Sequence, residues 1–578
     1  MNNILLDSLP IWITAQAQKT SNRGISASNL QLLGIQKLRE LILELAVRGK
    51  LVPQDPNDEP ASELLKRIKA EYKHLSKEGK IKKSKALPNI SEDEFPYDLP
   101  KGWEYVRLND LGEWGAGATP NRGNSEYYGG NIPWFKSGEL VGDYISESEE
   151  FVTELALTKS SLRYNKAGDV LIAMYGATIG KTSILKIPAT TNQAVCACTP
   201  FSDIYNVFLL TLLKAYKNRF ISMGAGGAQP NISREKIIAT VIALPPLAEQ
   251  HRIVAKVDEL MALCDELEKE QTNSNSAHET LVEVLLSTLT DAKNSDGFKS
   301  AWQRIARCFD TLFITEHSID KLKQTILQLA VMGKLVPQNP NDKPASELLK
   351  KIAAEKARLV KEGKIKKQAA LPEFTEEEKP FELPTGWEWV RLSQIGELAR
   401  GKSKHRPRND NSLYQNGIYP MIQTGDVAKA DKFIGTYTAL YNEKGLNQSR
   451  LWPKGTMCIT IAANIADTSI LGFDACFPDS IVGLIVSNEI GDARYFDYFI
   501  RTAKNRLTDY APSTAQKNIN LGILESVQIP LPPLNELNQI VFKVDELFAL
   551  CDSLKDGIKK AQEIQNLLAE EIVKKVVK

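Results

Sequence analysis

The feature that most constrains this chain is a long block of sequence that occurs twice. The run GKLVPQDPNDEPASELLKRI begins at Gly49 and returns as GKLVPQNPNDKPASELLKKI at Gly333, a shift of 284 residues. The same shift places GWEYVRL at Gly102 on GWEWVRL at Gly386. A period of this length predicts two duplicated units rather than a solenoid of short repeats.

Length and composition indicate a soluble protein of several domains. The chain has 578 residues, of which 43% are hydrophobic and 25% are charged, with a net charge of +1; this length suggests about three or four domains. No apolar run is long enough to cross a bilayer, and the first residues lack the basic and apolar regions of a signal peptide. Seven cysteines without metal-type spacing favour a reducing cytoplasm. Cys196 and Cys198 lie in an apolar run, which predicts buried thiols.

Each repeat begins with helices and then changes to strands. Apolar residues from Ile35 to Leu45 follow helical spacing, and the run VPQDPNDEP ends that helix with three prolines. Ser62 is the expected cap of a second helix. At GWEYVRL the hydrophobic period becomes two, which predicts a strand. From there to about residue 247 the chain is strand-like, with one helix near 205–220 and a buried strand at GDVLIAM, which begins at Gly168.

After each globular region the sequence Leu-Pro-Pro-Leu introduces a long helix with apolar residues at alternating spacings of four and three. Such a seam predicts that the helix pairs with another helix. The run QTNSNS near residue 271 is expected to loosen the first helix, before a second amphipathic stretch at about 278–289. The seam residues are Ile253, Val257, Leu260, Cys264 and Leu267 in the first helix, and Leu537, Ile540, Val544, Leu547, Cys551, Leu554 and Ile558 in the second.

We expect the two seam helices to pair with each other in an antiparallel manner. At about 25–45 residues each, they would span roughly 40–65 Å, which exceeds one turn of B-DNA, about 34 Å. The predicted fold class is mixed α/β (α+β), with two similar globular domains separated by long antiparallel coiled-coil helices and an internal pseudo-two-fold repeat. The expected segments are a helical block at 1–95, a globular domain at 96–247, a seam helix and second helical block at 248–380, a second globular domain at 381–534, and a final seam helix at 535–578.

The two globular regions share a frame but differ in one stretch. With a shift of 287 residues, PWFKSGE at Pro133 lies on PMIQTGD at Pro420, and Gly168 lies on Gly455. Between the first strand and Pro133 the copies are unrelated: one reads GAGATPNRGNSEYYGG and the other ARGKSKHRPRNDNSLYQNG. Two domains that share a fold but carry different loops are suited to recognise two different parts of a ligand.

Several motifs resemble those of one family. The pattern Leu-Pro-Pro-Leu-x-Glu-x-x-x-Ile-Val at 244–254 and 531–541, the preceding Gln-x-Asn-Ile, the two-fold repeat, and the run from Thr119 to IPW are similar to specificity subunits of type I restriction–modification enzymes. The resemblance covers nearly the whole chain. The second copy departs from it in two ways, because Asn-Glu-Leu replaces Ala-Glu-Gln after Leu-Pro-Pro-Leu and the TyrTyrGlyGly run is missing.

The resemblance implies a non-catalytic subunit. Each globular domain would be a target-recognition domain that reads one half of a split, asymmetric sequence in double-stranded DNA, and the helices would set the gap. Two methyltransferase subunits would dock on the helices, and two restriction and translocation subunits would complete the complex. S-adenosylmethionine and ATP with magnesium would bind those other chains, so no cofactor is expected on this one.

Base reading requires Arg, Lys, Asn or Gln side chains that enter a groove. The two globular regions are not strongly basic, with 14 Lys and Arg against 14 Asp and Glu at 96–247, and 16 against 15 at 381–534. Affinity for the DNA backbone is therefore expected to come from local basic patches on the surface or from partner subunits. The DNA-binding candidates are Arg122, Asn124, Lys136, Gln229 and Asn231 in the first half, and Arg400, Lys402, Lys404, Arg406, Arg408, Gln423, Gln516 and Asn518 in the second. A surface role without DNA contact remains open for these residues. Gln229, Asn231, Gln516 and Asn518 recur in both copies, which favours a shared turn or phosphate contact.

No catalytic set or paired-histidine metal motif is visible in the sequence. The run YGATIGKTS at Tyr175 resembles a phosphate loop but has three residues between its glycines, where a P-loop needs four. Two alternatives therefore stay open: a coiled-coil scaffold that binds proteins without reading DNA, and a P-loop enzyme.

Overall fold

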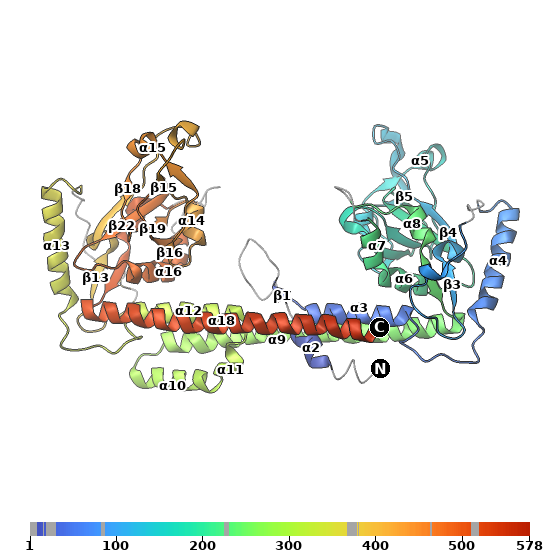
Figure 1. Cartoon of the computed structure of the whole chain (residues 1–578), viewed down its shortest axis with the longest axis horizontal. Coiled ribbons are helices and arrows are strands. Elements are labelled where there is room, and N and C mark those ends of the chain that lie inside the picture. The colour runs from blue at the N-terminus through green and yellow to red at the C-terminus, as the bar shows by residue number, and fades with distance from the viewer. Residues whose placement is uncertain are drawn as a thin grey trace. The chain divides into compact units, whose positions relative to one another are not determined.

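The computed structural model describes residues 8–15, 17–18, 30–81, 87–224, 230–366, 379, 381–462, 465–509 and 519–577. They form two compact units. The first holds the described residues up to Ser274 together with those from Gln562 onwards, and the second runs from Asn275 to Ala561. Each unit contains one globular domain and a group of helices (Figure 1).

Two helices of 44 residues each, α9 (Leu247–Thr290) and α18 (Leu534–Val577), contribute to both units. The other helices of the first unit are α2 (Leu9–Thr14), α3 (Leu33–Val47), α4 (Ala61–Lys77), α5 (Glu154–Lys159), α6 (Asn206–Ala215), α7 (Lys217–Gly224) and α8 (Arg234–Ala239). Those of the second are α10 (Ser295–Arg307), α11 (Phe309–Leu312), α12 (Glu316–Val331), α13 (Ala345–Lys361), α14 (Thr424–Lys429), α15 (Glu443–Asn447), α16 (Arg494–Asp509) and α17 (Leu521–Ser526).

The strands are short. In the first unit they are β1 (Ala17–Gln18), β2 (Leu30–Gln31), β3 (Glu104–Arg107), β4 (Gly112–Ala116), β5 (Tyr128–Phe135), β6 (Tyr144–Ile145), β7 (Phe151–Val152), β8 (Val170–Ala173), β9 (Thr182–Leu185), β10 (Thr190–Thr191), β11 (Val195–Pro200) and β12 (Val241–Leu244). In the second they are β13 (Glu388–Arg391), β14 (Gly396–Arg400), β15 (Tyr419–Met421), β16 (Phe433–Ile434), β17 (Ala439–Tyr441), β18 (Leu451–Trp452), β19 (Met457–Thr460), β20 (Thr468–Leu471), β21 (Ala475–Cys476), β22 (Ile481–Val486) and β23 (Gln528–Leu531).

The two globular domains have the same sheet topology. The order β4-β11-β8-β9-β6 in the first is matched by β14-β22-β19-β20-β16 in the second, and the pair β12-β3 by β13-β23. A smaller sheet, β10-β5-β7, corresponds to β17-β15-β21-β18, which has one additional strand. The mixed α/β fold with two similar domains is confirmed, as are the expected strands at GWEYVRL and GDVLIAM.

Each five-stranded sheet is buried on both faces, so its strands read as apolar runs rather than as an alternation with polar residues. One face of the first sheet packs with α6 and α3, and the other with Phe135, Leu140 and Ala189. Cys196 and Cys198 point into the first of these cores and are fully buried, as predicted. Burial raises the pKa of the Cys196 thiol to about 12.

The long helices pack in three-helix groups rather than as a simple pair. In the first unit, α3, the first half of α9 and the last turns of α18 share one core, in which Cys264 and Ala569 are buried. In the second unit, α12, the first half of α18 and the last turns of α9 share another, with Cys551 and Val282 buried. The start of one helix thus packs with the end of the other, which confirms the antiparallel prediction. The third helix joins because α3 and α12 have apolar stripes of their own to bury.

The repeat extends to the ion pairs between these helices. Arg39 of α3 lies 2.7 Å from Asp265 of α9, and at the same place in the second unit Lys323 of α12 pairs with Asp552 of α18. Each pair lies beside a buried cysteine of the long helix, Cys264 or Cys551. The duplication therefore preserves the packing of the helices and not only their sequence.

Three local predictions are wrong. Leu554, expected in the seam, is 40% exposed. A straight α-helix drifts from a seven-residue repeat, and here Lys555 takes the inner position. Its Nζ lies 2.8 Å from Asp320 of α12. The run QTNSNS does not loosen α9, which is continuous there; the Thr272 hydroxyl donates to the Glu268 carbonyl one turn earlier. Ser62 is not a cap, since α4 begins at Ala61, whose N–H bonds to the Gly102 carbonyl at 2.8 Å.

A buried carboxylate joins the repeated block to each long helix. The Glu249 side chain, at the start of α9, accepts hydrogen bonds from Trp103 Nε1 at 2.9 Å and Gln54 Nε2 at 3.1 Å. In the second unit the Glu536 side chain accepts from Trp387 Nε1 at 3.0 Å and Gln338 Nε2 at 3.3 Å. The motifs GKLVPQ, GWE and Leu-Pro-Pro-Leu-x-Glu thus meet at one point in each half.

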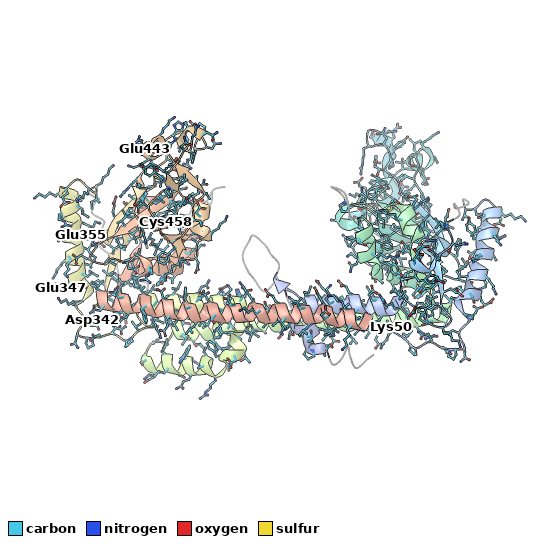
Figure 2. All side chains as sticks on the ribbon, viewed as in Figure 1. Lys50, Asp342, Glu347, Glu355, Glu443 and Cys458 are labelled. Carbon is cyan, nitrogen blue, oxygen red and sulfur yellow. The ribbon has the colours of Figure 1, made fainter. Side chains whose placement is uncertain are left out.

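The glycine of each GKLVPQ motif is required by that junction. Gly49 has φ +66°, and a Cβ there would lie 2.4 Å from Pro100 Cγ; Gly333 has φ +68° and would place a Cβ 2.5 Å from Pro384 Cγ. Only glycine adopts this conformation and leaves that space. In the second unit Asp342, labelled in Figure 2, lies in the same loop. Its carboxylate accepts from Asn535 Nδ2 of α18 at 3.0 Å.

Candidate nucleic-acid interface

In the first globular domain, two of the candidate cations meet at one carboxylate. Arg122 Nη1 lies 2.6 Å from Glu150 Oε2, and Lys136 Nζ lies 3.2 Å from Glu150 Oε1 and 2.9 Å from Glu149 Oε2. The Arg122 guanidinium also lies over the rings of Tyr128 and Trp134, at 4.7 and 4.9 Å from their centroids. These side chains come from β5, from the segment before it, from the residue after it and from the residues that lead into β7.

The ion pairs shift the protonation equilibria of this group. The hydrogen bond to Glu150 raises the pKa of Arg122, the bond to Glu149 raises the pKa of Lys136, and the bond from Arg122 lowers the pKa of Glu150. Arg122, Lys136 and Glu150 are therefore charged near neutral pH. The arrangement is a surface cluster of two cations and two anions.

Two asparagine candidates of this domain have local backbone roles. The Asn124 side chain accepts from the Glu126 N–H at 3.1 Å and so caps the turn η4 (Ser125–Tyr127). Asn231 is exposed, and its backbone forms a bridge with Tyr175. Gln229, Gln516 and Asn518 lie outside the described residues.

In the second domain, the basic stretch gathers around Asp479. The Arg400 Nε donates to the Asp479 carbonyl, Arg408 pairs with the Asp479 carboxylate, and Arg406 Nη2 lies 3.9 Å from that carboxylate. The Tyr414 hydroxyl donates to the Arg408 carbonyl at 2.7 Å and so fixes the backbone of this stretch. The cluster predicted from sequence is thus held together by a residue far along the chain.

Lys402, Lys404 and Gln423 complete the second set. All three side chains are exposed, and neither lysine pairs with an acidic residue in the described part of the chain. The backbone N–H of Gln423 donates to Asp426 Oδ2 at 2.7 Å at the start of α14. In the first domain the N–H of Lys136 donates to Glu139 Oε2 at 2.6 Å, at the start of the turn η5 (Ser137–Glu139).

Lys136 and Gln423 therefore occupy equivalent positions in space as well as in sequence. Each precedes a helical turn whose third residue accepts its backbone N–H. One presents an ammonium group and the other an uncharged amide. The frame is common to the two domains, and the chemistry that it presents differs.

The run that resembles a phosphate loop has the wrong surroundings for one. A P-loop wraps phosphates with the N-terminus of the helix that follows it. Here the segment makes the short turn η6 (Gly176–Thr178), and Lys181 then leads into strand β9. The structure therefore counts against the P-loop alternative. Among the described residues no cluster of His, Cys, Asp or Glu is placed to bind a metal ion.

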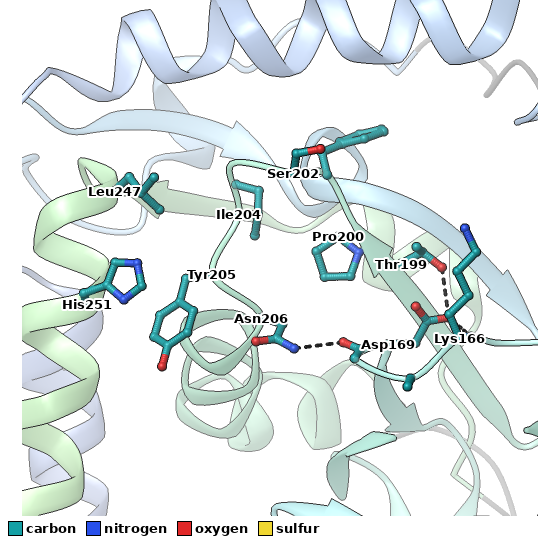
Figure 3. A pocket seen from close by; sticks show the side chains of 13 residues that line it. Lys166, Asp169, Thr199, Pro200, Ser202, Ile204, Tyr205, Asn206, Leu247 and His251 are labelled. Atoms are coloured by element: carbon teal, nitrogen blue, oxygen red, sulfur yellow. Dashed lines mark hydrogen bonds between the residues drawn. The ribbon is translucent and has the colours of Figure 1, made fainter. Parts of the chain in front are cut away.

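A hollow of about 440 Å³ lies where the first domain meets α9 (Figure 3). Tyr205 and His251 stack on one side with ring centroids 4.1 Å apart. On the other side the Asn206 amide donates to the Gly168 carbonyl at 3.0 Å, and the Thr199 hydroxyl to Asp169 at 2.9 Å. Several of the polar groups in the wall are thus bonded to each other, which is typical of a junction between elements rather than of a ligand site.

Sequence reasoning missed one surface on the helices. Leu263 and Leu550, at equivalent positions of α9 and α18, are 49% and 58% exposed, and Leu281 and Leu568, also equivalent, are 50% and 46% exposed. Exposed leucines that recur in register indicate a contact surface that occurs twice. The signal was available in the sequence, as leucines outside the seam spacing that repeat with the shift of 287 residues.

Sequence reasoning also missed Glu150 and Asp479, because acidic residues were not considered as parts of a DNA-binding surface. No spacing or period marks them, and Asp479 is far in sequence from the arginines that it binds. Only the fold brings them to the candidate cations.

Within the described residues, no helix combines the length and the apolar character needed to span a membrane.

The comparisons with known proteins agree on one family. The family described as "Type I restriction modification DNA specificity domain" matches residues 100–274 and 384–565. The chain is 38% identical to the type I restriction enzyme EcoAI specificity subunit of Escherichia coli over 99% of this chain and 98% of that protein. It is 37% identical to the EcoEI specificity subunit of Escherichia coli, again over 99% and 98%.

Among solved structures, the HsdS subunit from Thermoanaerobacter tengcongensis is 19% identical to this chain, with a TM-score of 0.38, and the match covers 84% of this chain and 98% of that one. The family matches both halves of the chain, each over a globular domain and the long helix that follows it. The relatives match over nearly their whole lengths. The chain therefore belongs to the family of type I restriction–modification DNA specificity subunits.

Proposed function

We propose that this chain is the non-catalytic DNA-reading subunit of a type I restriction–modification complex. Each globular domain reads one half of a split, asymmetric sequence in double-stranded DNA, and the long helices set the gap between the halves. Membership of the family and the duplicated fold support this role. The observation that carries it is the pair Lys136 and Gln423, two chemically different side chains on equivalent backbone turns.

Different groups on one frame are suited to reading different bases. A lysine donates to the O6 and N7 acceptors of guanine, whereas a glutamine both donates to and accepts from adenine. The stretches before β5 and β15 add to the difference, because the first domain has a compact cation–carboxylate cluster and the second has the arginine group around Asp479. Two domains of one fold would thus recognise unlike half-sites.

The helices are the proposed platform for partner subunits. Leu263 and Leu568 are exposed in the first unit, and Leu550 and Leu281 in the second. Two equivalent apolar surfaces suit two copies of one partner, which we assign as methyltransferase subunits; two restriction and translocation subunits would join the same complex. S-adenosylmethionine, ATP and magnesium are then bound by those chains, and the complex acts in the cytoplasm.

The test is to map methylated adenine and cytosine in DNA from cells that contain the chain with its methyltransferase partner, and from cells that lack the chain. The proposal predicts one split motif with two different halves, present only when the chain is present. The alternative, a scaffold that binds proteins without reading DNA, predicts assembly with the partner and no dependence of the methylated motif on this chain.

A further inference from the structure

In both globular domains, candidate DNA-contacting cations are bound to a carboxylate of the same domain. In the first, Glu150 binds Arg122 at 2.6 Å and Lys136 at 3.2 Å, and Glu149 binds Lys136 at 2.9 Å. One carboxylate thus pairs with both basic side chains of the candidate set in that domain. The backbone carbonyl of Glu150 accepts from Trp134 N at 2.9 Å, which fixes the backbone of Glu150 beside β5.

The second domain reaches the same arrangement with unrelated residues. The Asp479 carboxylate pairs with Arg408 and lies 3.9 Å from Arg406, and its backbone carbonyl accepts from Arg400. Asp479 precedes strand β22, whereas Glu150 precedes β7. Because Glu150 and Asp479 lie at different places in the common frame, the duplication alone does not account for a carboxylate beside the cations in each domain.

These ion pairs lie at the surface, where they can meet a ligand. The Arg122 side chain is 54% exposed and the Arg408 side chain 45% exposed. Exposed pairs of this kind contribute little to the stability of a fold. Their effect is instead to place the guanidinium groups and to lower the net positive charge of the surface.

The geometry of Arg122 leaves room for a second partner. Its bond to Glu150 uses Nη1, and a guanidinium carries five N–H donors. The Arg122 Cζ lies over the rings of Tyr128 and Trp134, and these contacts restrict where the guanidinium can lie. No other described residue binds its remaining donors by a hydrogen bond or ion pair. Those donors are free to meet the O6 and N7 acceptors of a guanine while the carboxylate stays in place.

The same carboxylate disfavours a phosphate at this position. A phosphate that approaches Arg122 or Lys136 places a negative charge close to Glu150 and Glu149, and like charges at such distances repel. A base edge is uncharged and meets no such repulsion. An interface that penalises the wrong ligand in this way gains specificity rather than affinity.

We propose that Glu150 and Asp479 are positioning residues that set the base specificity of their domains: each orients a guanidinium toward an uncharged base edge and weakens binding to the DNA backbone. The proposal rests on the DNA-reading function proposed above. It assigns a role to two acidic residues on an interface whose cations alone would bind any sequence.

The experiment uses the full chain assembled with its methyltransferase partner. Binding to three duplexes is measured over a series of salt concentrations: the mapped site, the site with the first half scrambled, and the site with the second half scrambled. The variants are Glu150→Gln and Asp479→Asn. Glu126→Gln is the matched control in the first domain and Asp431→Asn in the second, since neither carboxylate pairs with a cation of the described residues. Glu150→Asp keeps the negative charge and should bind the three duplexes as the original chain does.

Glu150→Gln is expected to bind one of the two scrambled duplexes, the one altered in the half that the first domain reads, several-fold more tightly and to lose discrimination in that half alone. It should also steepen the dependence of log K on log salt by about one unit, as one added phosphate contact does. Asp479→Asn should do the same for the other half. The proposal is overturned if Glu150→Gln and Glu126→Gln change binding equally, or if discrimination is unchanged. If the original chain does not distinguish the mapped site from scrambled DNA, the proposed function fails instead.

Discussion

Trp103 Nε1 donates a hydrogen bond of 2.9 Å to Glu249 Oε2, across 146 residues of chain and inside the protein, where Glu249 is 1% exposed. Trp387 and Glu536 repeat the bond at 3.0 Å, with Glu536 2% exposed. Each bond ties the residue just before the first strand of a globular domain to the start of a long helix. This bond is thus one of the contacts that orient the domain on its helix, together with the Tyr205–His251 stacking in the first unit.

Replacement of Trp103 by Phe should destabilise the first unit by about 1–3 kcal/mol, because a buried carboxylate then loses a donor. Trp387→Phe should have a similar effect on the second unit. Urea unfolding of the full chain, followed by circular dichroism, measures both. Trp302, 45% exposed, is the control, and Trp302→Phe should change the free energy of unfolding by less than about 0.5 kcal/mol. Equal effects at positions 103 and 302 would show that the bond does not fix the domain.

The same carboxylates should make stability depend on pH. Burial raises the pKa of Glu249 and of Glu536 above the usual 4.5. Between 4.5 and the folded-state pKa values the folded protein holds protons that the unfolded chain has released, so their contribution to the free energy of unfolding falls as the pH rises.

The double variant Glu249→Gln, Glu536→Gln lacks this dependence. The stability of the original chain relative to the variant should therefore decrease as the pH rises through this window, and should be constant well below 4.5. Thermal unfolding of both proteins from about pH 3 to about pH 8 measures the difference. A difference that increases with pH would mean that the two carboxylates have lowered pKa values in the fold.

The inner and outer faces of α18 should respond differently to truncation. Ile540 is fully buried, and Ile540→Ala should cost about 2–5 kcal/mol of unfolding free energy. Leu550 lies on the same helix and is 58% exposed, so Leu550→Ala should cost less than about 0.5 kcal/mol. Urea unfolding distinguishes the two. A large loss of stability at Leu550 in the isolated chain would show that its side chain packs within the fold.

The exposed leucines should matter for assembly instead. Leu263→Asp removes apolar contact from the surface of the first unit and Leu550→Asp from that of the second, so each should reduce the number of bound methyltransferase subunits from two to one. The double variant should bind none. Native mass spectrometry of the assembled complex counts the subunits. Leu155→Asp, in a globular domain at 39% exposure, is the control and should leave two subunits bound.

Much of the fold could be predicted from the sequence, because the duplication allows one half to be checked against the other. The antiparallel packing of α9 and α18 follows from two seams that no single helix can bury. The common frame of the two domains follows from residues such as Gly168 and Gly455, which recur with one shift. Leu554 was mispredicted because a seven-residue pattern in the sequence does not determine how far a straight helix rotates.

The candidate interface was only partly predictable. Arg122, Lys136 and the arginines near Asp479 could be named, because base reading favours those residue types. Their carboxylate partners could not, since Glu150 and Asp479 are brought to them by strand order rather than by sequence spacing. Asn124 is an example of the opposite error, because a residue type suited to base reading caps a turn instead.

The central claim is that two domains of one fold read two different half-sites. The most direct measurement is the methylated motif in cells that carry Lys136→Gln, compared with cells that carry the original chain. The account predicts that the first-domain half of the motif changes or relaxes at one base pair, while the other half and the gap stay the same. A motif that changes in both halves, or that is unaffected while overall methylation falls, would contradict it, because Lys136 would then contact the backbone and read no base.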